Sequence, residues 1–195
     1  VRRLNGIYAD NLAHHRVTLS GGRARLLGGM RVAIGAAVHQ AAHVVIATGG
    51  RPIVPDLPGA AHGITSDGFF ALGRVPASVA LVGSGYVAAE LSGVLAALGA
   101  RVTVLIRHDR MLRVFDEMLS AALRQAMQED GITVVDHAVP RAVTPGADGL
   151  AIAFEDGRTA GPFEVLIWAV GRRPNSDDLG LEAAGVATGA DGAVA

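Results

Sequence analysis

Length, composition and charge indicate a chain that folds around an apolar core, and they exclude several broad classes of protein. The 195 residues are half hydrophobic with a formal net charge of −1, so we expect a globular protein without general attraction to nucleic acid or anionic lipid. No apolar run approaches the roughly 18 to 20 residues of a membrane-spanning helix, and the first residues lack the apolar core of a signal peptide, which favours a cytoplasmic setting. The chain has no cysteine, which excludes a disulfide framework, a thiolate metal site and a redox-active dithiol within it. Truncation at both ends is expected, because the chain lacks an initial Met and stops in what reads as the approach to a strand.

The first third of the chain is predicted to contain a helix and a small β-meander. Apolar residues recur at helical spacing over 1–13, and short β-like stretches follow at 16–19 and 30–34. The β-branched run 44–47 ends at consecutive glycines, so we expect a buried strand there. Prolines at 52, 55, 58 and 76 predict an irregular connection and a domain boundary near residue 76.

From residue 78 the pattern changes to that of a βαβ unit. An apolar strand at 79–82 is followed by a glycine turn, a helix over 86–98 and a second apolar strand at 102–106, which implies a right-handed crossover and a parallel sheet.

The remaining elements continue an α/β pattern. Asp116 is a candidate cap for a helix that ends at Gly131. A strand at 132–135, a hairpin turning at 156–157 and an apolar strand at 165–169 follow. The apolar face of the helix is predicted to contain Met118, Leu119, Ala122, Leu123 and Met127.

The turn at 83–88 has the form G-x-G-x-x-A and lies between a strand and a helix, the context in which this motif binds a dinucleotide. Gly83 would make the sharp turn, Gly85 would let the backbone approach a pyrophosphate, and Ala88 would allow close packing of helix on strand. Free N–H groups and the positive end of the helix dipole would hold the diphosphate. The alternative is a glycine turn that binds nothing.

The end of the second strand favours NADPH over NADH. An NAD site usually has an acid there for the ribose 2′-hydroxyl, whereas this chain has Arg107, followed by further arginines at 110 and 113. Guanidinium groups can hold a 2′-phosphate through charge-assisted hydrogen bonds worth about 1.5–3 kcal/mol each. Two alternatives remain open: the arginines form an ordinary solvated face, or Asp109 is the ribose acid of an NAD site.

Three stretches of sequence resemble the pyridine nucleotide-disulfide oxidoreductase family, in its glutathione and trypanothione reductase branch. They are I-T-S-D-G-F-F at 64–70, G-S-G-Y-V-A-A-E-L at 83–91, and I-R-H-D-R-M-L-R-V-F-D at 106–116. The resemblance implies an α/β fold with a Rossmann-like NAD(P)-binding domain and a β-meander, plus partial segments of an FAD-binding domain. The expected division is 1–75 for the end of the first FAD-binding segment and the connection, 76–170 for the NADPH-binding domain, and 171–195 for the start of the return to the FAD-binding domain.

The resemblance also assigns roles to individual residues. Arg107 and Arg113 would bind the 2′-phosphate with His108 beside them, Ser84 and Val87 would line the dinucleotide cleft, and Tyr86 would cover the nicotinamide pocket. Glu90 would be the acid near the nicotinamide, although a solvated helix acid, like a plain packing role for Tyr86, is the alternative. On the side of FAD, the stretch A-T-G-G at 47–50 and G-R-R-P-N at 171–175 resemble family motifs. The cofactor-binding residues expected beyond the glycine turn and the arginines are therefore Ala24, Ala47, Thr48, Gly49, Gly171 and Arg172.

The resemblance implies an FAD-dependent enzyme that oxidises NADPH and reduces glutathione disulfide, and that forms a homodimer. The redox cysteine pair and the His-Glu acid/base pair of the family fall outside these residues, so no catalytic residue and no metal site are expected in this chain. Two alternatives stay open: a sister reductase acting on trypanothione or a similar disulfide, and a non-catalytic NADPH-binding module.

Overall fold

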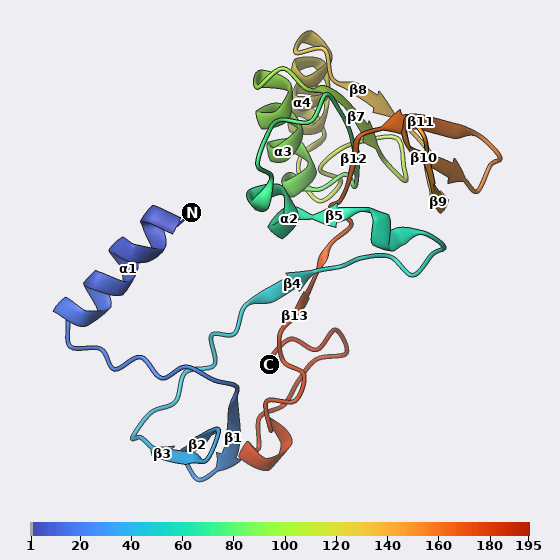
Figure 1. Ribbon diagram of the computed structural model, residues 1–195. Coiled ribbons are helices and arrows are strands. Elements are labelled where there is room, and N and C mark those ends of the chain that lie inside the picture. Colours follow the sequence, from blue (N-terminus) through green and yellow to red (C-terminus); the bar gives the residue numbers. More distant parts are fainter. Residues whose placement is uncertain (1) are drawn as a thin grey trace. The chain divides into compact units, whose positions relative to one another are not determined.

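The computed structural model describes residues 2–195, which form two compact units (Figure 1). One unit comprises residues 52–172, and the other comprises the described residues 2–51 and 173–195. The chain passes between the units at a two-stranded ribbon of β4 (Gly50–Pro52) and β13 (Arg172–Pro174).

A five-stranded parallel sheet forms the centre of the unit 52–172, as the βαβ pattern predicts. Its order is β5-β12-β6-β7-β8, and its strands are β5 (Ile64–Thr65), β6 (Ser78–Val82), β7 (Arg101–Leu105), β8 (Thr133–Val135) and β12 (Val165–Trp168). All four neighbouring pairs run parallel. Every residue of β6 is buried, because continuous apolar strands suit a sheet covered on both faces.

Helices cover one face of this sheet and a second sheet covers the other (Figure 1). Val79 and Leu81 of β6 pack with α3 (Tyr86–Ala97) and α4 (Glu117–Glu129). Their neighbours Ala80 and Val82 pack with the antiparallel sheet β11-β10-β9. That sheet contains β9 (Pro140–Gly146), β10 (Gly149–Phe154) and β11 (Thr159–Phe163). The predicted hairpin is therefore present, with β9 as a strand that the sequence patterns did not indicate.

Helix α4 begins and ends where the sequence predicts, but it buries a different face. The carboxylate Oδ1 of Asp116 accepts a hydrogen bond of 2.8 Å from the backbone N–H of Met118, and Gly131 follows the helix with a left-handed φ of 75°. Of the predicted apolar face, Met127 is buried and Leu123 is half-buried, whereas Met118, Leu119 and Ala122 are exposed. The buried stripe contains Ser120 instead, because its hydroxyl has a main-chain partner within the unit.

The connection before β6 contains regular structure that the prolines seemed to forbid. The short helices η1 (Ala60–His62) and α2 (Ser66–Ala71) lie there, and β5 pairs with β12. The contact-based unit consequently begins at Pro52, whereas the boundary predicted from the prolines lies at residue 76.

The other unit contains helix α1 (Arg2–His14) and the antiparallel meander β1 (Ala24–Gly28), β2 (Arg31–Ile34) and β3 (Ala37–Gln40), with the short helix η2 (Glu182–Ala184) in its C-terminal segment. Two predictions here were wrong. Residues 16–19 and 44–47 form no strand, since no neighbouring strand among the described residues bonds to either run. Val45, expected in a buried strand, is 85% exposed.

Candidate functional site

The turn after β6 requires glycine at position 83. Gly83 has a φ of 142°, and its N–H donates a 3.0 Å hydrogen bond to the carbonyl oxygen of Leu105 at the end of β7. A Cβ at this position would lie 2.2 Å from the carbonyl oxygen of Ala169. The first glycine of the motif is therefore fixed by the fold itself, independently of any ligand.

Gly85 differs, because nothing in the chain requires it to lack a side chain. It precedes α3 with an ordinary φ of −86°, and a Cβ built on it meets no atom within 4 Å. Among the described residues no side chain caps the start of α3, so the first N–H groups of this helix have no side-chain acceptor. Ala88 is fully buried against the sheet, as close packing of helix on strand requires. This end of α3 fits a phosphate-bearing ligand that approaches the main chain closely.

A groove of about 390 Å³ runs past this turn at the carboxyl ends of β6, β7 and β12. The chain continues from β6 to β7 on one side, while β12 flanks β6 on the other. Ligands of open parallel sheets bind at such a switch point. The lining residues are Pro55, Leu57, Val82, Gly83, Ser84, Gly85, Leu105, Arg107, Ala138, Val139, Pro140, Trp168, Ala169, Val170 and Gly171.

A smaller apolar hollow of about 200 Å³ adjoins the turn beside Tyr86. Its lining includes Val87 and Arg172, together with Pro52, Ser66, Gly85, Trp168, Ala169 and Gly171. Tyr86 is 55% exposed, so it does not serve as a core packing residue here. Glu90, one turn further along α3, is exposed and forms no ion pair with any described residue.

The arginine segment, residues 107–113, follows β7 at the edge of the larger groove. Arg107 lines the groove, and its Nε donates a 3.2 Å hydrogen bond to Nε2 of His108. Partial desolvation, and then the charges of Arg113 and Arg107, lower the pKa of His108 below its ordinary value. Asp109 does not line the groove. The only side chain that this segment adds to the lining is therefore cationic, which suits an anionic ligand group.

The residues expected on the side of FAD are divided between the two units. Ala24, Ala47 and Thr48 share one hollow of the unit that contains β1, and Gly49 follows with a left-handed φ of 64°. Arg172 belongs to the unit 52–172, where it lines the hollow beside Tyr86.

An ion-pair network that the sequence did not reveal lies next to Thr48. Arg51 donates to the side-chain oxygen of Asn175 at 2.9 Å and pairs with Asp177, and Asn175 donates to the carbonyl oxygen of Thr48 at 3.1 Å. The hydrogen bond from Arg51, and then its charge, lower the pKa of Asp177. Ala24 and Thr48 line a hollow of about 570 Å³ with Arg51 and Asp177.

Two further contributions to the groove were not predicted from the sequence. Trp168 is 1% exposed and donates from Nε1 to the carbonyl oxygen of Ala60 at 2.9 Å, yet it lines both the groove and the hollow beside Tyr86. Residues 138–140 line the same groove as Arg107. The apolar pattern at 165–169 could have indicated Trp168, because that strand pairs with β6, which leads into the glycine turn. Residues 138–140 have no sequence pattern that indicates their position.

The described residues contain neither a cluster of metal ligands nor a membrane-spanning helix. Within residues 2–195, no group of three or more His, Asp or Glu side chains is arranged to hold a metal ion. None of the helices described is both long enough and apolar enough to cross a bilayer.

Known relatives match the chain over nearly its whole length. It is 39% identical over 188 residues to "Glutathione reductase" of Nostoc sp. (strain PCC 7120 / SAG 25.82 / UTEX 2576), which covers 95% of this chain and 41% of that protein. It is 36% identical over 195 residues to "Glutathione reductase, chloroplastic/mitochondrial" of Pisum sativum, covering 100% of this chain and 35% of the relative. The chain thus spans well under half of each relative.

Solved structures share the fold. The HOCl-induced flavoprotein disulfide reductase RclA from Escherichia coli superposes with a TM-score of 0.90 at 22% identity, covering 100% of this chain and 45% of that one. LpdA from Mycobacterium tuberculosis gives 0.85 at 25% identity, covering 98% and 44%. These likenesses confirm the predicted α/β, Rossmann-like fold class. A family model described as "Pyridine nucleotide-disulphide oxidoreductase" matches residues 1–195, and the chain therefore belongs to the pyridine nucleotide-disulphide oxidoreductase family.

Proposed function

We propose that the groove beside the glycine turn binds NADPH, as part of an FAD-dependent disulfide reductase that acts on glutathione disulfide. The observation that carries the proposal is the position of Arg107, which lines the groove at the end of β7 where an NAD site would have an acid. A guanidinium there attracts a 2′-phosphate, whereas a carboxylate would repel it.

Each part of the groove suits a different part of the cofactor. The free N–H groups at the start of α3 and the open space at Gly85 suit the diphosphate. Arg107, Arg113 and His108 would surround the 2′-phosphate. Tyr86 and Val87 line the neighbouring hollow, where the nicotinamide would lie, and Tyr86 would cover that ring. Bound NADPH supplies a hydride, and the share of these residues is to hold and orient it.

The residues assigned to FAD form the second part of the proposal. The hollow lined by Ala24 and Thr48 also contains two arginines, and each of them forms an ion pair with an aspartate of the same lining. Its polar side chains would contact a nucleotide there. Gly49 and Ala47 adjoin Thr48 in sequence, and the assignment of Arg172 to FAD rests on the family motif at 171–175. We retain the division into FAD-side segments at 1–75 and 171–195 and an NADPH-binding domain at 76–170.

Substrate, assembly and location rest on the relatives. Both curated relatives are named glutathione reductase, which favours glutathione disulfide over a related disulfide such as trypanothione. The homodimer and the cytoplasmic setting expected from the sequence stay proposals, and the Pisum sativum relative is described as chloroplastic/mitochondrial.

Calorimetric titration of the 195-residue chain with NADPH and with NADH tests the cofactor assignment. We expect a preference for NADPH that falls by roughly 10- to 100-fold in Arg107→Ala, because one charge-assisted hydrogen bond contributes about 1.5–3 kcal/mol. Arg101→Ala is the matched control, since Arg101 is an exposed arginine at the opposite end of the same strand. Equal binding of both dinucleotides by the unsubstituted chain would overturn the proposal.

A further inference from the structure

Two side chains of α4 hold the main chain of the arginine segment. Ser120 and Arg124 are four residues apart, so they lie on one face of the helix. The hydroxyl of Ser120 donates a 2.6 Å hydrogen bond to the carbonyl oxygen of Met111. Nη1 of Arg124 donates to the carbonyl oxygen of Asp109 at 3.2 Å. The segment that carries Arg107 and Arg113 is thus tied to α4 at two of its carbonyl groups.

Arg124 also binds the segment that follows β8. Its Nη1 and Nη2 donate to the two carboxylate oxygens of Asp136 at 2.7 and 2.9 Å. The side chains are only 28% and 34% exposed, and the hydrogen bond to Asp136 raises the pKa of Arg124 further. This bidentate geometry fixes the plane of the guanidinium. Arg124 therefore joins two loops, one before α4 and one after β8.

The loop after β8 is also held by the side chain of Arg158. Nη2 of Arg158 donates to the carbonyl oxygens of Asp136 and His137 at 3.2 and 2.9 Å. The N–H of His137 in turn donates to the carbonyl oxygen of His108 at 3.2 Å. The carbonyl oxygen of His108 thus accepts a hydrogen bond from this loop, and that of Asp109 accepts one from the side chain of Arg124.

We infer that Arg124 is a positioning residue for dinucleotide specificity: it places the backbone of the arginine segment so that Arg107 and Arg113 meet the 2′-phosphate of the ligand. The inference rests on the proposed NADPH site. Arg107 and Arg113 are exposed, so their own surroundings constrain them little and the backbone that carries them sets where their charges lie. The charge of Arg124 is paired with Asp136, so its direct attraction for a phosphate is small beside its effect on geometry.

The test compares NADPH and NADH affinities of the full chain with those of Arg124→Met, which keeps an apolar stem and removes every donor. We expect NADPH affinity to fall about tenfold and NADH affinity to change by less than about twofold, because NADH does not use the arginine segment. Gln125→Ala is the control, since Gln125 lies on the same helix and bonds only to Glu129.

The double variant Arg124→Met/Asp136→Asn separates positioning from simple charge. Both charges of the pair are removed, so the net charge equals that of the unsubstituted chain. Positioning predicts that the NADPH preference stays reduced in the double variant. A restored preference would mean that an unpaired Asp136 repelled the phosphate, and it would overturn the inference.

Further outcomes are equally decisive. An unchanged preference in Arg124→Met, or an equal loss for both dinucleotides, would overturn the positioning role. If Arg124→Met does not fold, Arg124→Lys serves instead, because it keeps the charge but lacks the planar fork of the guanidinium. We expect Arg124→Lys to lose a smaller part of the NADPH preference. Full NADPH preference in this variant would refute the inference. Absence of NADPH preference in the unsubstituted chain would remove the proposed function and this inference with it; preference that survives in Arg124→Met removes the inference alone.

Discussion

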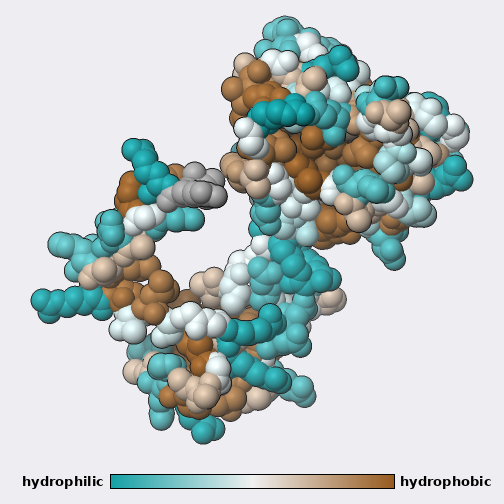
Figure 2. Space-filling view, in the orientation of Figure 1, coloured by the Kyte–Doolittle hydropathy of each residue, from teal (hydrophilic) through white to brown (hydrophobic). Residues whose placement is uncertain are grey.

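The two units differ in how far they bury their apolar residues. Within the described residues, every buried apolar residue except Leu181 belongs to the unit 52–172. In the other unit, Ile7 and Tyr8 of α1 and Val45 are exposed, and Figure 2 shows apolar surface on that helix. The apolar runs at 44–47 and 79–82 look alike in sequence, but only the second has neighbouring strands. Apolar character predicts a strand only where a partner completes the hydrogen bonding and the packing.

The largest effect is expected from Gly83→Ala, which places a Cβ against the main chain of Ala169 in the well-packed unit. Strain at a φ of 142° adds to that clash, so we expect a loss of about 4 kcal/mol or more in the free energy of unfolding. Urea denaturation followed by circular dichroism measures it. Stability within about 1 kcal/mol of the unsubstituted chain would show that the turn is less rigid than described.

Two substitutions by alanine, one in each unit, test the difference in burial between the units. Leu81→Ala removes a fully buried side chain from the central strand and should cost about 2–5 kcal/mol of unfolding free energy. Val45→Ala removes an exposed one and should cost less than about 0.5 kcal/mol. The same denaturation assay compares them, and equal losses would contradict the assignment of the core to one unit.

Gly85→Ala tests whether the second glycine of the turn serves a ligand. Its Cβ meets no protein atom within 4 Å, so stability should change by no more than about 1 kcal/mol. NADPH affinity should fall about tenfold or more, because the methyl group occupies the space that the diphosphate needs. Energy transfer from Trp168, the single tryptophan, to bound NADPH provides the titration signal. Undiminished affinity would place the diphosphate elsewhere.

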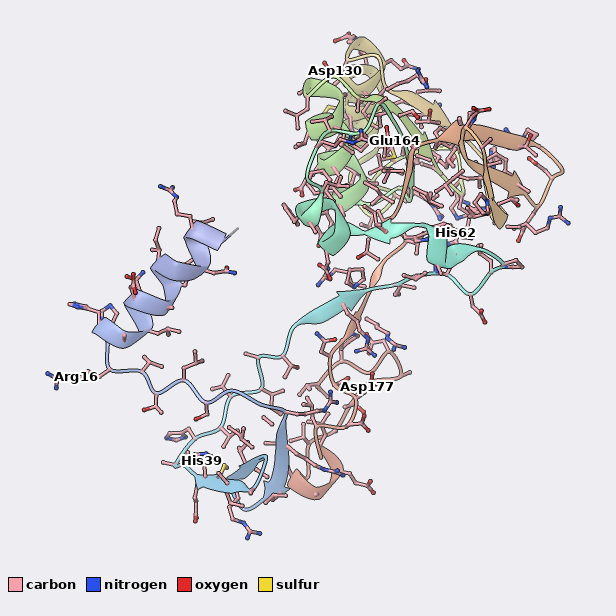
Figure 3. All side chains as sticks on the ribbon, viewed as in Figure 1. Arg16, His39, His62, Asp130, Glu164 and Asp177 are labelled. Carbon is pink, nitrogen blue, oxygen red and sulfur yellow. The ribbon has the colours of Figure 1, made fainter. Side chains whose placement is uncertain are left out.

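The smallest effect is expected from Glu164→Gln, beside the start of β6 (Figure 3). A hydrogen bond from the N–H of Ala77, and then one from Arg74, lower the pKa of Glu164. Its stabilising contribution is therefore present above the ordinary carboxyl pKa and lost as pH falls through the lowered value. The variant should have a slightly lower urea midpoint at pH 7, and this difference should shrink and then vanish at lower pH, as the carboxyl of the folded state becomes protonated. A difference that persists at the lower pH would contradict this origin.

The sequence predicted the glycine turn, the parallel sheet and the cationic edge of the groove, because each depends on local residues and a short crossover. It did not predict the buried face of α4, where apolar spacing favoured Met118 and the structure buries Ser120. The contacts of Arg124 were likewise not predicted, since its partners lie 15 and 12 residues away in sequence and only the fold brings them together. Long-range polar contacts leave no periodic signal in sequence, whereas buried strands and glycine turns do.

A crystal structure of the chain with NADPH bound is the most direct test of the account. We expect the diphosphate at the start of α3 beside Gly85, and the 2′-phosphate within hydrogen-bonding distance of Arg107. A dinucleotide that lies outside the groove, or whose 2′-phosphate points into solvent away from the arginine segment, would contradict the assignment of this site to NADPH.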